Sequence, residues 1–234
     1  MPTSSDARTD DAAGAQKYRG FLGDIEAART LARHLTNKDA QSFSWSAVTV
    51  TVKDRKTKQS IPILSSSYGH VRAGELVALM GPSGCGKTTL LNVLAHRIAS
   101  NNARVEGQVL LNDRQINRAE LRHISGYVEQ EDALIGSLTI RETVDFAARL
   151  ALPSGTTAME RRQRVSDLID AFGLQHQSST IIGTPIQKGI SGGQKRRCGL
   201  AAQLVTSPRI LFLDEPTSGL DSAASREVMT ISPR

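Results

Sequence analysis

Residues 81–88 read Gly-Pro-Ser-Gly-Cys-Gly-Lys-Thr, a glycine-rich run that ends in a lysine and a hydroxyl side chain. Glycines allow the backbone to curl so that successive N–H groups point at phosphate oxygens, and the dipole of a following helix favours the same negative charge. The Lys87 ammonium can then reach the β- and γ-phosphates of a nucleotide, and the Thr88 hydroxyl can take a position on magnesium. The spacing predicts a phosphate-binding loop. The alternative, coincidence, is disfavoured because the run lies between an apolar segment and an amphipathic one.

Two carboxylates follow an apolar run farther along the chain. Residues 209–213 are predicted to form a buried strand, and Asp214 and Glu215 come directly after it. Ligands of open α/β sheets bind at the carboxyl ends of the strands, so Asp214 is in a position to hold the magnesium ion or its waters. Glu215 can polarise an attacking water as a general base. The alternative is that the two acids only solubilise a strand end.

A second glycine pair stands at the expected start of another helix, where residues 191–194 read Ser-Gly-Gly-Gln. The Ser191 hydroxyl and the bare N–H groups of Gly192 and Gly193 would form a second anion site. One chain does not need two such sites for one nucleotide. In a head-to-tail dimer, however, the second loop of one subunit could cover the γ-phosphate held by the other. A plain glycine helix cap is the alternative.

The elements that must position these residues alternate between strands and helices. Val48, Val50 and Val52 alternate with polar residues, which predicts a half-buried strand. Thr139 and Glu142 have the spacing of a capping box and open a helix. Further strands are predicted over residues 61–64, 75–80, 105–111, 124–129 and 209–213, and helices over residues 87–100, 139–151, 158–172, 191–205 and 222–231. A strand, glycine loop and helix followed by more such alternation indicates an α/β fold with a largely parallel central sheet.

Length and composition bound the class of protein. The chain has 234 residues, of which 39% are apolar, and a net charge of +6 from 29 Lys and Arg against 23 Asp and Glu. This is a globular composition for one large domain with a solvated extension over residues 1–40. Residues 25–35 predict a short amphipathic helix, which could instead dock on a partner or on a membrane surface. The apolar runs are far shorter than the about 20 residues of a membrane-spanning helix. Two cysteines exclude a disulfide framework, and the N-terminus lacks the apolar core of a signal peptide, so a reduced, cytosolic setting is expected.

Taken together, the motifs resemble the nucleotide-binding domain of an ABC transporter. Walker A corresponds to residues 81–88, Walker B to residues 211–216, the LSGGQ-like signature to residues 190–194 with isoleucine first, and the D-loop to residues 218–221. Gln130, within the segment 126–130, matches the Q-loop glutamine. In the family that residue senses magnesium and the lytic water and couples to the membrane domain.

The resemblance implies a P-loop NTPase fold of the ABC type over residues 41–234, with a mostly parallel central sheet, an antiparallel β subdomain and a helical subdomain near residues 131–190. It implies ATP and Mg²⁺ as cofactors and ATP hydrolysis as the reaction. The implied catalytic residues are Glu215 and Gln130, and the implied metal-site residues are Thr88, Gln130 and Asp214. The implied nucleotide-binding residues are Gly81, Pro82, Ser83, Gly84, Cys85, Gly86, Lys87, Thr88, Thr89, Ser191, Gly192, Gly193 and Gln194.

Finer features resemble the G subfamily, the pigment, sterol and drug exporters whose nucleotide domain comes first. They lie in residues 126–132, 138–150 and 216–222. This resemblance implies that a second nucleotide-binding domain pairs head to tail with this one. It also implies a transmembrane domain, normally on the same polypeptide, and no nucleic-acid partner. The expected location is the cytoplasmic face of a membrane, as part of an integral transporter.

Departures from the family pattern leave alternatives open. In the family, a histidine that contacts the γ-phosphate follows the Walker B acids, whereas no histidine follows Asp221 here, so the cassette is expected to be incomplete at its C-terminus. A truncated fragment that binds ATP without turnover and serves only as a dimerisation module is therefore an alternative to a transporter motor. A soluble ABC ATPase of translation or DNA repair is a third. For adenine stacking, Phe43, Trp45 and Tyr68 are available, and Trp45 fits the core equally well; Cys85 is either just a small residue or a redox switch.

Overall fold

The computed structural model describes residues 40–54, 57, 59–97, 103–130, 133–218, 222 and 225. Nearly all of the predicted extension with its helix, residues 98–100 of the helix predicted from Lys87 and nearly all of the helix predicted from Ser222 lie outside the described residues. The helix from Lys87 ends at Leu94, so the helix predicted over residues 95–97 is wrong. The boundaries of the extension, the domain and its helical subdomain stay predictions. Within the described part of the chain, no helix is long and apolar enough to cross a membrane.

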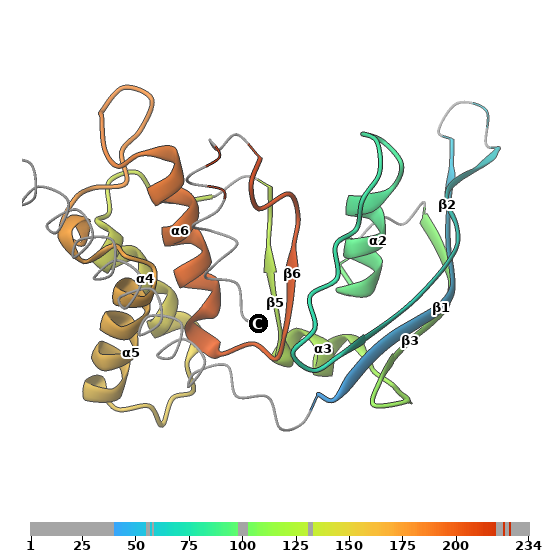
Figure 1. The fold of residues 1–234 in the computed structure, drawn as a ribbon, viewed down its shortest axis with the longest axis horizontal. Helices are drawn as coiled ribbons and strands as arrows, with labels where there is room; N and C mark the ends of the chain where they lie inside the picture. Colours follow the sequence, from blue (N-terminus) through green and yellow to red (C-terminus); the bar gives the residue numbers. More distant parts are fainter. Residues whose placement is uncertain are drawn as a thin grey trace, which may run out of the picture.

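One layer of the fold is a four-stranded antiparallel sheet with strand order β2-β1-β3-β4 (Figure 1). Its strands are β1 (Ser42–Lys53), β2 (Ser60–Arg72), β3 (Ala103–Leu111) and β4 (Arg114–Gln115). Val48 and Val50 of β1 are each 1% exposed, as expected from their alternation with polar residues. β2 is much longer than the segment predicted from its sequence because it pairs with β1 from end to end.

A pair of short parallel strands lies between this sheet and the main group of helices (Figure 1). The strands are β5 (Ser125–Val128), which follows helix α3 (Arg118–Ile124), and β6 (Ile210–Leu213). Both confirm their predicted strands. Along β6 the side chains alternate between two cores: Phe212 packs with the antiparallel sheet, whereas Leu211 and Leu213 pack with the helices. A register slip of one residue would exchange the two faces, so the register of β6 is strongly specified.

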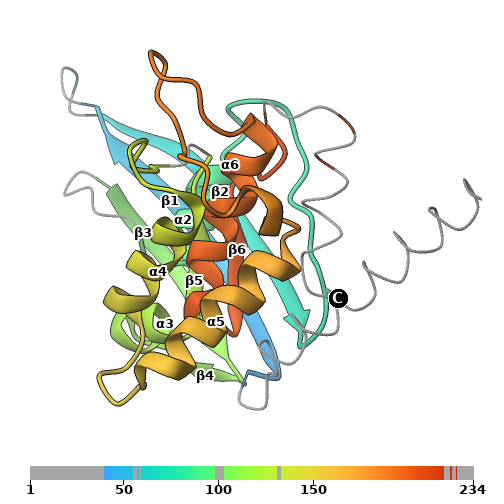
Figure 2. The same cartoon turned by 90° about the vertical axis from the view of Figure 1, so that its left-hand side faces the viewer.

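Helices lie on both sides of the parallel pair. α2 (Lys87–Leu94) lies on the side of the antiparallel sheet and packs against it (Figure 1). Figure 2 views the molecule from the side of α4 (Ile140–Ala151) and α5 (Ala158–Ala171), which lie in front of α6 (Gly192–Gln203). The 3₁₀ turns η1 (Gln175–Gln177) and η2 (Leu204–Thr206) complete this part. Capping boxes at Thr139, Thr157 and Ser191 start the three long helices, so the helix predicted from Thr139 is confirmed.

The strand predicted over residues 75–80 is wrong. After β2 the chain turns, with the Glu75 carboxylate accepting a hydrogen bond from the Arg72 N–H, and then continues to the glycine loop without strand pairing. A buried parallel strand needs hydrogen-bonded neighbours and covered faces, yet within the described residues β6 pairs only with β5. Leu76, Val77 and Met80 are 62%, 46% and 91% exposed, whereas Leu79 is half-buried against the core of the antiparallel sheet.

Candidate functional site

The glycine loop, residues 81–86, ends on the N-terminus of α2. Gly84 and Gly86 have φ angles of 80° and 95°, in the left-handed region that favours glycine. Gly86 is the N-cap of α2, and a Cβ there would lie 3.3 Å from the Ile63 carbonyl oxygen. The first N–H groups of a helix have no intrahelical acceptor and carry partial positive charge. The loop therefore has the backbone shape and the helix end that phosphate binding requires.

The Lys87 side chain folds back over the loop. Its Nζ donates hydrogen bonds to the carbonyl oxygens of Gly81 and Pro82, both at 3.0 Å. The ammonium is thus held by two carbonyl groups that a phosphate can replace. Of the other predicted loop residues, Gly81, Pro82, Ser83, Gly84, Cys85 and Thr88 are exposed, and Thr89 is half-buried.

Asp214, at the carboxyl end of β6, is 6% exposed and lies at the centre of the site. Its Oδ1 accepts a hydrogen bond from the Thr88 hydroxyl at 3.0 Å, and its Oδ2 accepts one from the Tyr127 hydroxyl at 3.4 Å. Burial and the nearby Asp214 carboxylate raise the pKa of Tyr127 to about 12, so its hydroxyl stays protonated at neutral pH. The structure therefore brings the predicted metal-site residues Thr88 and Asp214 together and adds Tyr127.

The oxygens of Thr88 and Asp214 fit a magnesium ion. Mg²⁺ takes hard oxygen ligands at about 2.0–2.1 Å in an octahedron, so two adjacent ligands lie about 2.9 Å apart. The 3.0 Å between Thr88 Oγ1 and Asp214 Oδ1 matches that spacing. Among the described residues, no group of three or more His, Cys, Asp or Glu side chains could hold a metal. Phosphate and water oxygens are of the same hard oxygen type and could complete the octahedron at this pair.

Glu215 and Gln130 meet beside this pair. The Gln130 Nε2 donates a hydrogen bond to Glu215 Oε2 at 2.9 Å, and both residues are exposed. Glu215 has a φ of 45°, a left-handed conformation that costs free energy in a non-glycine residue. The structure thus brings Gln130 to the predicted base, Glu215, rather than into contact with the Thr88–Asp214 pair.

The Ser-Gly-Gly-Gln motif caps α6. The Gln194 N–H donates to the Ser191 hydroxyl at 3.2 Å, and the Ser191 N–H donates to Gln194 Oε1 at 2.9 Å. This arrangement leaves the N–H groups of Gly192 and Gly193 without intrahelical acceptors. In Figure 1 the N-termini of α2 and α6 lie at the same end of the molecule but on opposite sides of β5 and β6. The chain therefore does not bring its two glycine motifs to one ligand.

Sequence reasoning missed two residues that hold the site together. Tyr127 follows a glycine inside a short strand, where an aromatic side chain usually signals only core packing. Arg196 lies in a run of basic residues on α6, which usually indicates a solvated face, yet it is 4% exposed. Its guanidinium donates to the backbone carbonyls of Glu129, Asp214 and Pro216. The composition and spacing of the run carried no signal that separated it from its neighbours.

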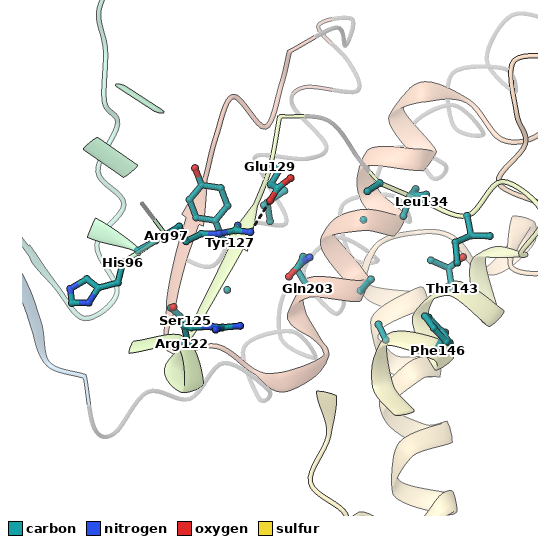
Figure 3. A pocket seen from close by; sticks show the side chains of 18 of the residues that line it. His96, Arg97, Arg122, Ser125, Tyr127, Glu129, Leu134, Thr143, Phe146 and Gln203 are labelled. Atoms are coloured by element: carbon teal, nitrogen blue, oxygen red, sulfur yellow. Dashed lines mark hydrogen bonds and ion pairs between the residues drawn. The ribbon is translucent and has the colours of Figure 1, made fainter. Parts of the chain in front are cut away.

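A cleft of about 690 Å³ lies next to the Gln130 segment, between α3, β5, α4 and α6 (Figure 3). One side of the cleft is basic and includes Arg97. The Cζ of Arg97 lies 4.4 Å from the centre of the Tyr127 ring, and its Nη2 forms an ion pair with Glu129 Oε1 at 2.8 Å. The other side includes the apolar side chains of Leu134 and Phe146. The cleft therefore suits a partner with both acidic and apolar groups.

Three aromatic residues were available for stacking on a base. Phe43 and Trp45 are 6% and 7% exposed and belong to the core between the antiparallel sheet and α2. The Trp45 Nε1 also donates a hydrogen bond to the Ser67 hydroxyl at 3.1 Å. Tyr68, at 67% exposed, is the one of the three whose ring is open to a ligand.

Comparison with known families identifies the chain. The sequence profile of the family described as "ABC transporter" matches residues 64–218. The chain belongs to this family. The match spans the glycine loop, Gln130, the α6 cap and Asp214–Glu215 of this ABC domain, so the family resemblance drawn from the motifs is confirmed.

The relatives agree with the G-type features. "ABC transporter G family member 1" of Dictyostelium discoideum is 44% identical over 185 residues, covering 78% of this chain and 23% of that protein. "ABC transporter G family member 11" of Arabidopsis thaliana is 43% identical over 205 residues, covering 88% of this chain and 27% of that protein. The chain thus spans about a quarter of the length of these relatives.

A solved structure supports the fold class. The chain is similar, with a TM-score of 0.64 and 29% identity, to the structure titled "Dimeric structure of a post-hydrolysis state of the ATP-binding cassette MJ0796 bound to ADP and Pi". The similarity covers 81% of this chain and 80% of that one. The predicted ATP-binding cassette fold is therefore confirmed, although the parallel sheet has two strands within the described residues.

Proposed function

We propose that this ABC domain binds ATP with Mg²⁺ and hydrolyses it to power transport across a membrane. The observation that carries the proposal is the hydrogen bond from the Thr88 hydroxyl to Asp214 Oδ1 at 3.0 Å, beside the glycine loop. The two residues are 126 positions apart in the chain. A second pair, Gln130 and Glu215, lies at the same ends of β5 and β6. The residues proposed to bind the nucleotide and those proposed to activate water therefore lie next to each other at one edge of the domain.

Each residue has a distinct role in the proposed reaction. The loop amides and the Lys87 ammonium bind the β- and γ-phosphates, and Thr88 and Asp214 hold the magnesium ion. When bound, magnesium neutralises part of the charge on the phosphate oxygens. Glu215 accepts a proton from water as the water oxygen bonds to the γ-phosphorus, and the bond to the bridging oxygen breaks to release ADP. Gln130 orients Glu215 and the water.

The proposed partner for catalysis is a second ABC domain bound head to tail. The N-termini of α2 and α6 point to the same end of the molecule from opposite sides of the parallel pair. The Ser191–Gly193 cap of one domain can then cover the γ-phosphate on the Lys87 loop of the other. The solved relative is described in its title as dimeric, which supports this arrangement.

The proposed transport role needs a transmembrane domain, and the domain would work on the cytoplasmic face of a membrane. The named relatives are ABC transporters about four times as long as the matched segment. The cleft beside Gln130 is our candidate for the surface that the membrane domain contacts, because Glu129 on its rim directly precedes Gln130. Contact there would change the position of Gln130.

Nucleotide titrations test the proposal. We expect a fluorescent ATP analogue to bind the purified chain more tightly with Mg²⁺ than with EDTA. Lys87→Ala should weaken binding at least tenfold, because it removes a cation from the phosphate site, whereas Lys53→Ala, a matched change at the exposed end of β1, should not. Equal affinity of Lys87→Ala and the unaltered chain would overturn the proposal. Phosphate release measured beside binding separates a working ATPase from a domain that only binds.

A further inference from the structure

We propose that Arg196 is a positioning residue that ties the signature helix α6 to the two loops that carry Gln130 and Glu215. The proposal deepens the proposed function and rests on it for its consequence, although the contacts exist without nucleotide. Its guanidinium bonds backbone carbonyls at the predicted site, so its role would be exerted through the backbone of Gln130 and Asp214.

The contacts of Arg196 are directed at two strand ends. The Nη1 donates to the carbonyl oxygen of Glu129 at 2.6 Å and lies 3.5 Å from that of Gln130. The Nε donates to the Pro216 carbonyl at 3.0 Å and the Nη2 to the Asp214 carbonyl at 3.4 Å. One side chain therefore holds the exits of β5 and β6.

The chemistry of the side chain explains why arginine stands there. A buried cation is costly unless hydrogen bonds satisfy it, and Arg196 is 4% exposed. The guanidinium is a planar fork of five N–H donors, which can bond several carbonyl oxygens in different directions at once. Lysine has the same charge but concentrates its donors on one nitrogen at the end of a flexible stem. Arg196→Lys should therefore keep the charge and lose the fixed spacing of the two loops.

The placement of Arg196 on α6 gives these contacts a consequence. Ser191 caps the same helix five residues earlier, less than two turns away. A movement of the cap toward a nucleotide on the partner would be passed through the rigid helix to the carbonyls of Glu129 and Gln130. Arg196 thus links the Ser191 end of α6 to Gln130 and Glu215, the residues proposed to activate water in the same domain.

The first measurement uses no nucleotide. The Asp214 N–H donates to the Val128 carbonyl at 3.0 Å, between the two loops. In the purified chain, Arg196→Lys should make this amide exchange with deuterium at least about tenfold faster, because the loops lose their common anchor. The control is Arg197→Lys, the same change one residue along, where the Nη1 bonds the Phe172 carbonyl among the helices. Exchange at Asp214 that is unchanged in Arg196→Lys, or equally faster in both variants, would overturn the proposal.

The second measurement uses a fluorescent ATP analogue with Mg²⁺ or with EDTA. Loss of residues that orient metal ligands typically weakens metal binding about 10–100-fold. We expect Arg196→Lys to reduce the Mg²⁺-dependent gain in affinity about tenfold and to leave the affinity in EDTA within about twofold. Arg197→Lys should keep the full gain, and a full gain in Arg196→Lys would contradict the positioning role. Absence of binding by the unaltered chain would instead refute the proposed function, while the exchange result still decides on Arg196.

Discussion

The hydrogen bond between Thr88 and Asp214 makes the sharpest prediction about the site. Thr88→Val keeps the shape of the side chain but removes the hydroxyl that donates to Asp214 Oδ1 at 3.0 Å. A hydrogen bond to a charged group contributes about 1.5–3 kcal/mol, and the exposure of Thr88 favours the lower end. The variant should therefore unfold at a lower temperature than the unaltered chain even without ligand.

The effect on the magnesium complex is separate and can be calculated. ATP with Mg²⁺ at one hundred times its Kd stabilises a protein by about 2.7 kcal/mol. If Thr88→Val weakens that complex tenfold, the stabilisation falls to about 1.4 kcal/mol. A domain of this size shifts its Tm by about 2–4 °C per kcal/mol, so the Tm shift produced by ATP with Mg²⁺ should fall from about 5–11 °C to about 3–6 °C.

Differential scanning fluorimetry with ATP and either Mg²⁺ or EDTA measures both effects. The matched control is Thr143→Val in α4, where the lost hydroxyl donates to the Thr139 carbonyl at 2.8 Å, away from the site. Thr143→Val should lower the basal Tm and keep the Mg²⁺-dependent shift. The reasoning is refuted if Thr88→Val keeps the full Mg²⁺-dependent shift, because Thr88 is then not part of the metal site.

Three further predictions concern single positions. Glu215→Gln should leave ATP bound but reduce phosphate release at least about a hundredfold, since it removes the proposed base; unchanged release would exclude that role. The pKa of Tyr127 is raised to about 12 in the folded chain, from about 10 in the unfolded chain. Folding therefore favours the protonated hydroxyl, and this contribution to the free energy of unfolding is full below about pH 10 and is lost toward pH 12. The Tm should therefore fall more between about pH 10 and 12 in the unaltered chain than in Tyr127→Phe, and an equal fall would contradict this. Gly69→Ala should lower the free energy of unfolding, measured by urea denaturation, by about 1–3 kcal/mol, because the new Cβ would lie 2.1 Å from the Trp45 ring. The control is Gly155→Ala, whose Cβ would meet nothing within 4 Å and which should leave the free energy of unfolding unchanged.

Local patterns in the sequence predicted the parts of the fold that short-range physics controls. The capping box at Thr139 requires only residues three apart, and the structure has it. The alternation of Val48 and Val50 requires only one buried face, which the antiparallel sheet supplies. The glycine loop requires left-handed backbone at fixed positions, and Gly84 and Gly86 provide it. Each of these features is encoded within a few residues.

Features that depend on distant partners were not predictable in this way. The apolar segment at residues 75–80 has the composition of a buried strand, but its pairing depends on other segments, and within the described residues it has no ladder. The choice between core and stacking for Trp45 was settled by Gly69, its partner across β1 and β2, which leaves room for the indole. Neither outcome is written in the local sequence.

The site shows why the residues that hold a catalytic group are harder to find than the group itself. Asp214 and Glu215 are marked by their position after an apolar strand, because chemistry needs acids at a strand end. Arg196 is marked by nothing local, since its role depends on carbonyl groups at two strand exits that any residue could supply. Burial distinguishes Arg196 from its neighbours: it is 4% exposed, whereas Lys195 and Arg197 are half-buried. Sequence spacing gives no criterion for a positioning residue of this kind, but the structure does. A basic side chain on a helix is a candidate when it is buried and its donors reach backbone carbonyls at two strand ends.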